Sequence, residues 1–206
     1  YTFPLVDCAM MPIENTTEGV VNHTLDMFID SNLRIYGEIL QEVSHHLLSK
    51  SGLMEDVKKI QSHPHALAQC RNWLETNLPH VPTVEVASTA RAAEMCVDDQ
   101  ASAAIASELA GQLYGLKVIK ARIEDNLNNF TRFLVLSQKP SEQTGKDKTS
   151  LMLSVKDKVG ALYDLLRPFA SYGISMTKIE SRPSQRKAWE YIFFVDVEGH
   201  RNEERV

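Results

Sequence analysis

One polar stretch divides this chain into two parts with different patterns. Between Leu136 and Leu151 the sequence reads SQKPSEQTGKDKTS, which contains no large apolar residue. Charged and turn-forming residues over that length cannot bury a hydrophobic face, so we expect an exposed linker. We therefore predict a larger region over residues 1–137, a linker over 138–147 and a smaller region over 148–206.

The larger region alternates short strands with short helices. Val21, Leu25 and Phe28 have helical spacing, whereas the small residues of 102–106 predict a buried strand, as does the apolar run CAMMPI of residues 8–13. This alternation favours α/β layers with much parallel sheet. In such sheets, ligands bind at the carboxyl ends of strands, beside the N-termini of helices.

Polar side chains gather at these predicted strand–helix junctions. Backbone N–H groups at several helix starts, with hydroxyls beside them, suit a small anionic molecule. For any single Ser or Thr, a helix N-cap is the simpler explanation. The junction residues are Glu14, Asn15, Thr16, Ser62, His63, Ser88, Thr89, Ser107 and Thr131.

The smaller region predicts the order strand, helix, strand, strand. Leu151, Leu153 and Val155 alternate as in a half-buried strand, and residues 160–169 carry apolar side chains on one helical face. Strands over residues 174–179 and 191–197 follow. This order begins a ferredoxin-like α+β unit, and the chain stops before the second helix and last strand that would complete it.

Composition excludes several classes of protein. The chain has 206 residues and a net charge of −5, which argues against a nucleic-acid or polybasic membrane surface. No apolar stretch approaches the roughly 18 residues of a membrane span. The opening YTFPLVDCAMMPIEN lacks the basic start of a signal peptide. Cys8, Cys70 and Cys96 form no disulfide pattern, so we expect reduced thiols in a cytoplasmic protein.

The histidines favour no metal site. His63 and His65 flank Pro64, but no carboxylate or cysteine stands nearby at ligand spacing. His45 and His46 follow a predicted strand, and we expect them on the surface. The chain also lacks the motifs G-x-S-x-G, G-x-G-x-x-G and the Walker loop, which leaves acyl transfer, dinucleotide binding and nucleotide hydrolysis without support.

Seven short motifs occur in order along the whole chain. They are PIENT with Gly19 (12–19), SHP (62–64), STA (88–90), AIA followed by LYGL (104–106, 113–116), NFTRF (129–133), GAL (160–162) and ESRP (180–183). In this order they resemble the prephenate dehydratase family with its C-terminal ACT regulatory domain. The resemblance implies a two-lobed α/β catalytic domain like periplasmic binding proteins over 1–137, with its substrate in the cleft, and an ACT domain over 148–206.

The resemblance implies a carbon–oxygen lyase of phenylalanine biosynthesis. The family converts prephenate to phenylpyruvate with loss of water and carbon dioxide, and it needs no cofactor because aromatisation drives the reaction. Thr131 would donate a proton or hydrogen bond to the departing hydroxyl, Asn15 would be a polar contact, and Glu14 would orient the site or share a proton. The implied substrate-binding residues are Thr16, Ser62, His63, His65, Ser88, Thr89, Ala90, Arg132 and Phe133; for Arg132 a structural salt bridge is the open alternative.

The resemblance also implies regulation by L-phenylalanine. ACT domains of the family pair across a subunit interface and bind phenylalanine there, which predicts a homodimer or homotetramer. Gly160 would let the ligand approach the backbone, since glycine lacks a side chain. The implied effector-binding residues are Gly160, Ala161, Leu162, Glu180, Ser181, Arg182 and Pro183.

The chain departs from the family pattern in three places. His65 stands where the family usually has glutamine, and its protonation would make activity depend on pH near about 6–7. The family's opening strand with its G-P-x-G-T/S segment, and the end of the ACT unit, are absent, so we expect a fragment of a longer protein. Two alternatives stay open: arogenate as substrate, and a non-enzymatic amino-acid sensor.

Overall fold

The computed structural model describes residues 7–155, 158–184 and 190–206. Contacts group the chain into two units. Unit 1 comprises Tyr1–Glu14, Val20–Ile39 and Arg132–Val206, and unit 2 comprises Asn15–Gly19 and Leu40–Thr131. The first six residues of the opening segment, in which we expected no signal peptide, lie outside the described residues.

Unit 2 is built on a five-stranded sheet with the order β6-β5-β7-β4-β8. Strand β5 pairs in parallel with β6 and β7, while β4 pairs antiparallel with β7 and β8. The sheet is therefore mixed, with its parallel part where the sequence predicts strand–helix alternation. The strands are β4 (His46–Ser49), β5 (Lys59–Ser62), β6 (Thr83–Glu85), β7 (Ser102–Ala106) and β8 (Lys117–Lys120).

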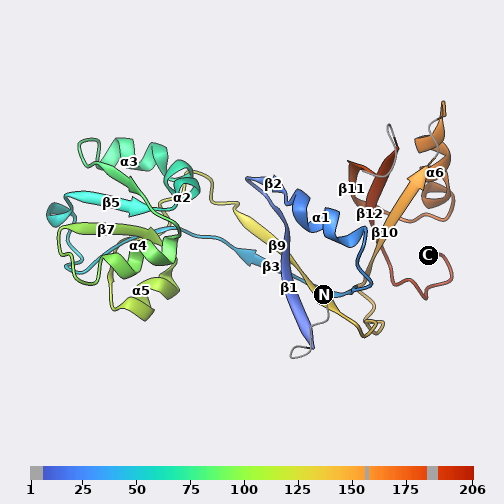
Figure 1. Ribbon diagram of the computed structural model, residues 1–206, viewed down its shortest axis with the longest axis horizontal. Coiled ribbons are helices and arrows are strands. Elements are labelled where there is room, and N and C mark those ends of the chain that lie inside the picture. The colour runs from blue at the N-terminus through green and yellow to red at the C-terminus, as the bar shows by residue number, and fades with distance from the viewer. Residues whose placement is uncertain (1–6, 156–157, 185–189) are drawn as a thin grey trace. The chain divides into compact units, whose positions relative to one another are not determined.

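Helices cover both faces of this sheet (Figure 1). Ile105 and Ala103 pack with α2 and α3, while Ala104 and Ala106 pack with α4 and α5. The small residues of β7 let helices approach both faces closely. The helices are α2 (Pro64–Gln69), α3 (Arg71–Asn77), α4 (Thr89–Met95) and α5 (Glu108–Tyr114), with the short 3₁₀ helix η1 (Met54–Asp56) before β5.

Unit 1 contains the helix α1 (Asn22–Phe28) and most of a sheet with the order β2-β1-β9-β3. Ile13, Leu25 and Leu134 form the centre of their core. We expected the apolar run of residues 8–13 to form a buried strand. It forms strand β1, but it is not buried along its length, because exposed residues alternate with covered ones. The strands are β1 (Cys8–Asn15), β2 (Gly19–Val20), β3 (Arg34–Glu42) and β9 (Phe130–Ser137).

The C-terminal part of unit 1 has the predicted order β10, α6, β11, β12. The three strands form an antiparallel sheet with the order β10-β12-β11. Val195 and Val197 pack with Phe169 of α6 on one face. Ile192 and Phe194 lie in the core of Ile13, Leu25 and Leu134 on the other face. The bounds are β10 (Lys148–Val155), α6 (Ala161–Ser171), β11 (Met176–Pro183) and β12 (Tyr191–Glu198).

Two expectations about exposure have opposite outcomes. Most residues of 138–147 are exposed between β9 and β10, as predicted for a linker. The prediction that His45 and His46 lie on the surface is wrong: they are 7% and 6% exposed. His46 begins β4 and pairs with Ala106 inside the sheet. This strand has only four residues, which is too short for the sequence pattern to reveal it. No helix among residues 7–155, 158–184 and 190–206 is long and apolar enough to cross a membrane.

Candidate functional site

The side chain of Asn15 is held at both ends of its amide. Its Oδ1 accepts the backbone N–H groups of Thr17 and Glu18, at 2.8 and 3.0 Å. Its Nδ2 donates to Asn129 Oδ1 at 2.8 Å and to Thr131 Oγ1 at 2.9 Å. Because the N–H groups of Thr17 and Glu18 require an acceptor on their side, a flipped amide would lose both of these hydrogen bonds, which fixes the orientation of Asn15.

This arrangement defines what the Thr131 hydroxyl can do. A hydroxyl has one hydrogen and two lone pairs. Asn15 occupies a lone pair of Oγ1, so the hydrogen of Thr131 stays available for donation to a group outside this network. The geometry brings Asn15 and Thr131, two of the three residues that we expected to be catalytic, into direct contact, and it leaves Thr131 as a hydrogen-bond donor.

A chain of polar side chains continues from Asn15 within unit 2. Asn129 Nδ2 donates to Gln69 Oε1 at 3.1 Å, and His45 Nε2 lies 2.8 Å from the same oxygen. Gln69 Nε2 donates to Glu18 Oε1 at 3.0 Å. The sequence suggested no role for Gln69, Asn129, His45 or Glu18. Asn129 opens the motif that contains Thr131, and Glu18 lies within the motif of residues 12–19, so both had a signal; Gln69 and His45 lie in none of the motifs.

The hydroxyls at the helix starts serve local structure. Ser62 Oγ is fully buried and donates to the Ile105 carbonyl at 2.6 Å. Ser88 and Ser107 accept the N–H groups of Arg91 and Ala110, as N-caps of α4 and α5. The parallel strands bring these positions to one edge of the sheet. Thr89 and Ala90 form the first turn of α4, and Thr16 Oγ1 bonds the backbone of Asn128 and Phe130.

His63 and His65 lie at the start of α2. The His63 Nδ1 accepts the backbone N–H of His65 at 3.2 Å, so His63 is the N-cap. The two rings meet edge to face with centroids 5.0 Å apart. His65 Nδ1 lies 3.7 Å from Glu18 Oε2, with 69% of its side chain exposed. Among residues 7–155, 158–184 and 190–206, no three potential metal-ligating His, Cys, Asp or Glu side chains gather.

Unit 1 contains a second polar group, which we call the charge cluster: Glu14, Glu38, Arg132, Lys148, Lys178 and Asp196. Arg132 is central. Its Nη1 lies 2.7 Å from Asp196 Oδ2 and 3.2 Å from Glu14 Oε1, and its Nε lies 2.7 Å from Glu38 Oε2. Lys178 pairs with Glu14, and Lys148 Nζ lies 2.6 Å from Glu38 Oε1. The guanidinium of Arg132 is therefore occupied by three carboxylates.

Burial and ion pairing act in opposite directions on the charge cluster. Partial burial alone would raise the pKa of Glu14, but hydrogen bonds from Lys178 and Arg132 outweigh it and lower that pKa. The pKa of Glu38 is likewise lowered by Lys148 and Arg132 against the effect of burial. Burial would lower the pKa of Arg132, but Asp196, Glu38 and Glu14 raise it. All three side chains are therefore charged at neutral pH.

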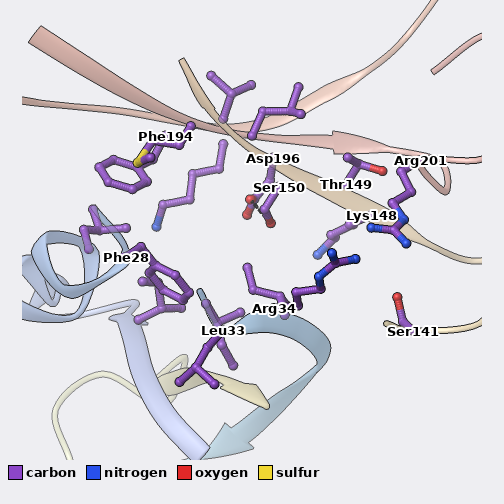
Figure 2. Close-up of a pocket in the computed structure, with 18 of the residues that line it drawn as sticks. Phe28, Leu33, Arg34, Ser141, Lys148, Thr149, Ser150, Phe194, Asp196 and Arg201 are labelled. Atoms are coloured by element: carbon purple, nitrogen blue, oxygen red, sulfur yellow. Dashed lines mark hydrogen bonds between the residues drawn. The ribbon is translucent and has the colours of Figure 1, made fainter. Parts of the chain in front are cut away.

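Four members of the charge cluster line a cavity of about 320 Å³ within unit 1: Arg132, Lys148, Lys178 and Asp196. Figure 2 shows Phe28, Leu33 and Phe194 at one end of this cavity. Arg34, Lys148 and Arg201 lie toward the other end. Phe133, the last residue of its motif, is half-buried on β9, where it follows Arg132.

The residues expected to bind an effector lie on α6 and β11. Gly160 is the N-cap of α6 with φ +79°, and no atom lies within 4 Å of the Cβ that another residue would carry there. Ala161 and Leu162 open the helix. Glu180, Ser181, Arg182 and Pro183 are consecutive on β11, so their side chains alternate between its faces. Arg182 is occupied by Asp26 of α1, through contacts of 3.0 and 2.8 Å.

Comparison with known proteins agrees with this arrangement. The sequence profile of prephenate dehydratase matches residues 4–141, and that of the ACT domain matches residues 149–206. This chain belongs to the prephenate dehydratase family. The predicted α/β fold class with a C-terminal ACT domain is thereby confirmed.

Three relatives illustrate the family. A bifunctional chorismate mutase/prephenate dehydratase of Aquifex aeolicus is 54% identical over 97% of this chain and 55% of its own length. An arogenate dehydratase/prephenate dehydratase of Arabidopsis thaliana is 39% identical over 95% of this chain and 54% of its length. The crystal structure of an Arthrobacter aurescens prephenate dehydratase in complex with L-Phe has a TM-score of 0.85 and 39% identity, covering 98% of this chain and 68% of that one. The chain thus spans about half the length of the curated relatives described here.

Proposed function

We propose that this chain is the dehydratase and regulatory part of an enzyme that converts prephenate to phenylpyruvate. The observation that carries the proposal is the Thr131 hydroxyl, which Asn15 holds with its hydrogen free to donate. Both residues lie in the part of the chain that matches the dehydratase profile. Residues 1–137 would form the catalytic domain, 138–147 the linker and 148–206 the ACT domain.

For this reaction the protein needs to bind prephenate and to place one hydrogen-bond donor at the departing hydroxyl. The bond between the ring and its carboxylate breaks, carbon dioxide leaves, and the electron pair enters the ring as the ring C–OH bond breaks. The departing oxygen carries negative charge and becomes water after taking one proton. Donation from Thr131 would stabilise that charge as it forms. Amides at the starts of α2 and α4 would hold the carboxylates of the substrate.

Thr131→Ala tests the proposal directly. Phenylpyruvate formation from prephenate is measured at neutral pH, beside the uncatalysed reaction. We expect Thr131→Ala to lose roughly 10²–10⁴-fold in kcat, the range for a lost proton donor, and Thr131→Ser to retain most activity. Thr76→Ala is the matched control, because that exposed hydroxyl only bonds the Asn72 carbonyl in its own helix. Equal rates for Thr131→Ala and the wild type would contradict the role of Thr131.

One relative supports arogenate as the alternative substrate. The Arabidopsis relative is named for both arogenate and prephenate dehydratase. The same assay is therefore run with each substrate, and the ratio of kcat/KM values decides between them. A wild-type chain that binds an aromatic amino acid but turns over neither substrate would instead support the sensor.

Regulation by L-phenylalanine is part of the proposal. Its support is the match of residues 149–206 to the ACT profile, together with a relative whose crystal structure is described as a complex with L-Phe. The backbone around Gly160 and the strand with Ser181 would contact the effector. A homodimer or homotetramer and a cytoplasmic location remain predictions, which light scattering and cell fractionation would test.

A further inference from the structure

The charge cluster joins the ACT strands to the two strands that carry the proposed catalytic pair. Arg132 and Glu14 come from β9 and β1, and they are the direct sequence neighbours of Thr131 and Asn15. Their partners Asp196 and Lys178 come from β12 and β11. Residues of the regulatory part thus complete the ion pairs of residues next to the proposed site.

The central pair of the cluster is largely removed from water. The side chains of Arg132 and Asp196 are 9% and 11% exposed, and their contact of 2.7 Å is shorter than the 3.2 Å between Arg132 and Glu14. Three cations face three carboxylates in the charge cluster, so its charges balance. Loss of one partner would leave an uncompensated buried charge, which is strongly unfavourable.

Two further contacts hold Asp196 in place. Ser150 Oγ donates to its second oxygen, Oδ1, at 2.6 Å. Phe194, two residues earlier on β12, belongs to the core that also contains Ile13 and Leu134. Asp196 therefore lies beside an apolar contact between β12 and the sheet of β1 and β9. Because packed interiors resist compression, such a contact transmits displacements.

We infer that Asp196 and Lys178 are positioning residues for the proposed reaction, which keep β9 and β1 in the arrangement that the Thr131–Asn15 contact requires. This inference rests on the proposed function. Successive side chains of a strand point to opposite faces, so Arg132 and Glu14 leave Thr131 and Asn15 free to face another direction. Asp196 and Lys178 act on the catalytic pair through the backbone and touch no substrate.

The same strand offers a route for regulation. Lys178 and Arg182 are four residues apart on β11, and they hold Glu14 of β1 and Asp26 of α1. Ser181, which we propose near the effector, lies between them on this strand. A shift of β11 on effector binding would therefore pull on both carboxylates.

Asp196→Asn tests the inference in the 206-residue chain. We expect kcat to fall about tenfold to a hundredfold, as misplacement of a catalytic group does, with KM changed less than about twofold. Ser150→Ala, which keeps every charge, should give a smaller loss in the same direction, and Asp196→Glu should recover part of the rate. Glu94→Gln is the control, since Glu94 forms only an exposed ion pair with Arg91 on α4.

Hydrogen exchange gives a second readout that does not need turnover. Asp196→Asn should speed exchange in peptides covering 8–15 and 130–137 more than in peptides from β5 and β7. Wild-type kcat in both Asp196→Asn and Ser150→Ala would overturn the inference, as would faster exchange spread evenly over the chain. An inactive wild type would instead count against the proposed function, and the exchange comparison would still decide whether Asp196 holds these strands.

Discussion

At the scale of single residues, the polar side chains at the proposed site and in the charge cluster form hydrogen bonds and ion pairs with one another. Both polar atoms of the Asn15 amide are hydrogen-bonded, and Thr131 Oγ1 accepts one of these bonds, which leaves its hydrogen for donation to the proposed substrate. Arg132, for which a substrate contact and a structural salt bridge were both open, pairs with three carboxylates in unit 1. Its contact with substrate stays a prediction.

Asn15→Asp should remove donation from this position while keeping its two backbone acceptor contacts. The carboxylate can still accept the N–H groups of Thr17 and Glu18, but it can no longer donate to Thr131 Oγ1 or to the buried Asn129 Oδ1. The Thr131 hydrogen would then bond the new carboxylate, and we expect kcat to fall about 10²-fold or more, with a lower melting temperature because Asn129 Oδ1 loses its donor. Asn126→Asp is the control, because Asn126 Oδ1 accepts only the Asn128 N–H. Equal kcat values in the two variants would rule out the role of this donor.

Glu38→Gln should alter the pH dependence of stability. The folded-state pKa of Glu38 is lowered, because Lys148 and Arg132 outweigh burial. A carboxyl with a lowered pKa stabilises the fold above its unfolded pKa, and that contribution is lost as the pH falls through the folded value. We expect the wild-type melting temperature to fall below about pH 4 and Glu38→Gln to fall less steeply.

At neutral pH, the wild type should have the higher melting temperature of the two proteins. Glu38→Gln leaves Arg132 and Lys148 short of a carboxylate, so its melting temperature should lie about 2–4 °C below that of the wild type. Calorimetry between about pH 3 and 7 measures both effects. Parallel curves for the two proteins would show that Glu38 does not contribute to the acid sensitivity.

At the scale of elements, short helices depend on their ends. Helix α5 starts at the Ser107 cap and ends at Gly115, whose φ of +63° lies in the left-handed region. The Leu116 N–H then bonds the Gly111 carbonyl, which closes the helix. Ser107 was predictable as a cap because a cap needs only its near neighbours. The helix end follows the same local logic.

Gly115→Ala should therefore destabilise unit 2. No atom lies within 4 Å of the added Cβ, so the cost is that of the left-handed backbone alone, about 1 kcal/mol. Gly115→Asn should lose less, since asparagine tolerates this conformation better. Gly37→Ala is a control with open space around its Cβ and no positive φ. Denaturant unfolding gives the free energies, and an equal loss for Gly115→Ala and Gly37→Ala would contradict the backbone explanation.

At the scale of the whole molecule, the two units can be followed separately through their thiols. Cys70 and Cys96 are fully buried in unit 2, whereas Cys8 is exposed on β1 of unit 1. Burial raises the pKa of Cys70 to about 12, with Glu124 and Asp125 adding to the effect, and burial also raises the pKa of Cys96. Since the thiolate is the reactive form, two effects protect Cys70 and Cys96 from thiol reagents: burial blocks access, and the raised pKa lowers the thiolate fraction.

A thiol reagent at about pH 8 should label Cys8 rapidly and the other two only when unit 2 opens. Labelling in increasing denaturant, read by mass spectrometry of peptides, then gives the opening of unit 2 by itself. Cys8→Ser removes the fast phase and serves as the control. Rapid labelling of Cys70 in the native protein would contradict the burial of α2 against the sheet.

Features that depend on near neighbours along the chain were predictable from the sequence. Pro64, Ser88 and Ser107 mark helix starts, the alternation of Leu151 and Leu153 marks a strand, and the motif order indicates the family. Caps and periodicity are local, since their hydrogen bonds and faces are set within a few residues.

The partners of the polar side chains, in contrast, became visible only in the folded chain. Gln69 reaches Asn129 across 60 residues, and Arg132 of β9 reaches Asp196 of β12. His45 was expected on the surface, but it is buried directly before a strand too short for its pattern to be recognised. Such partners depend on how strands and helices pack over long sequence separations, and no spacing along one chain segment encodes that packing.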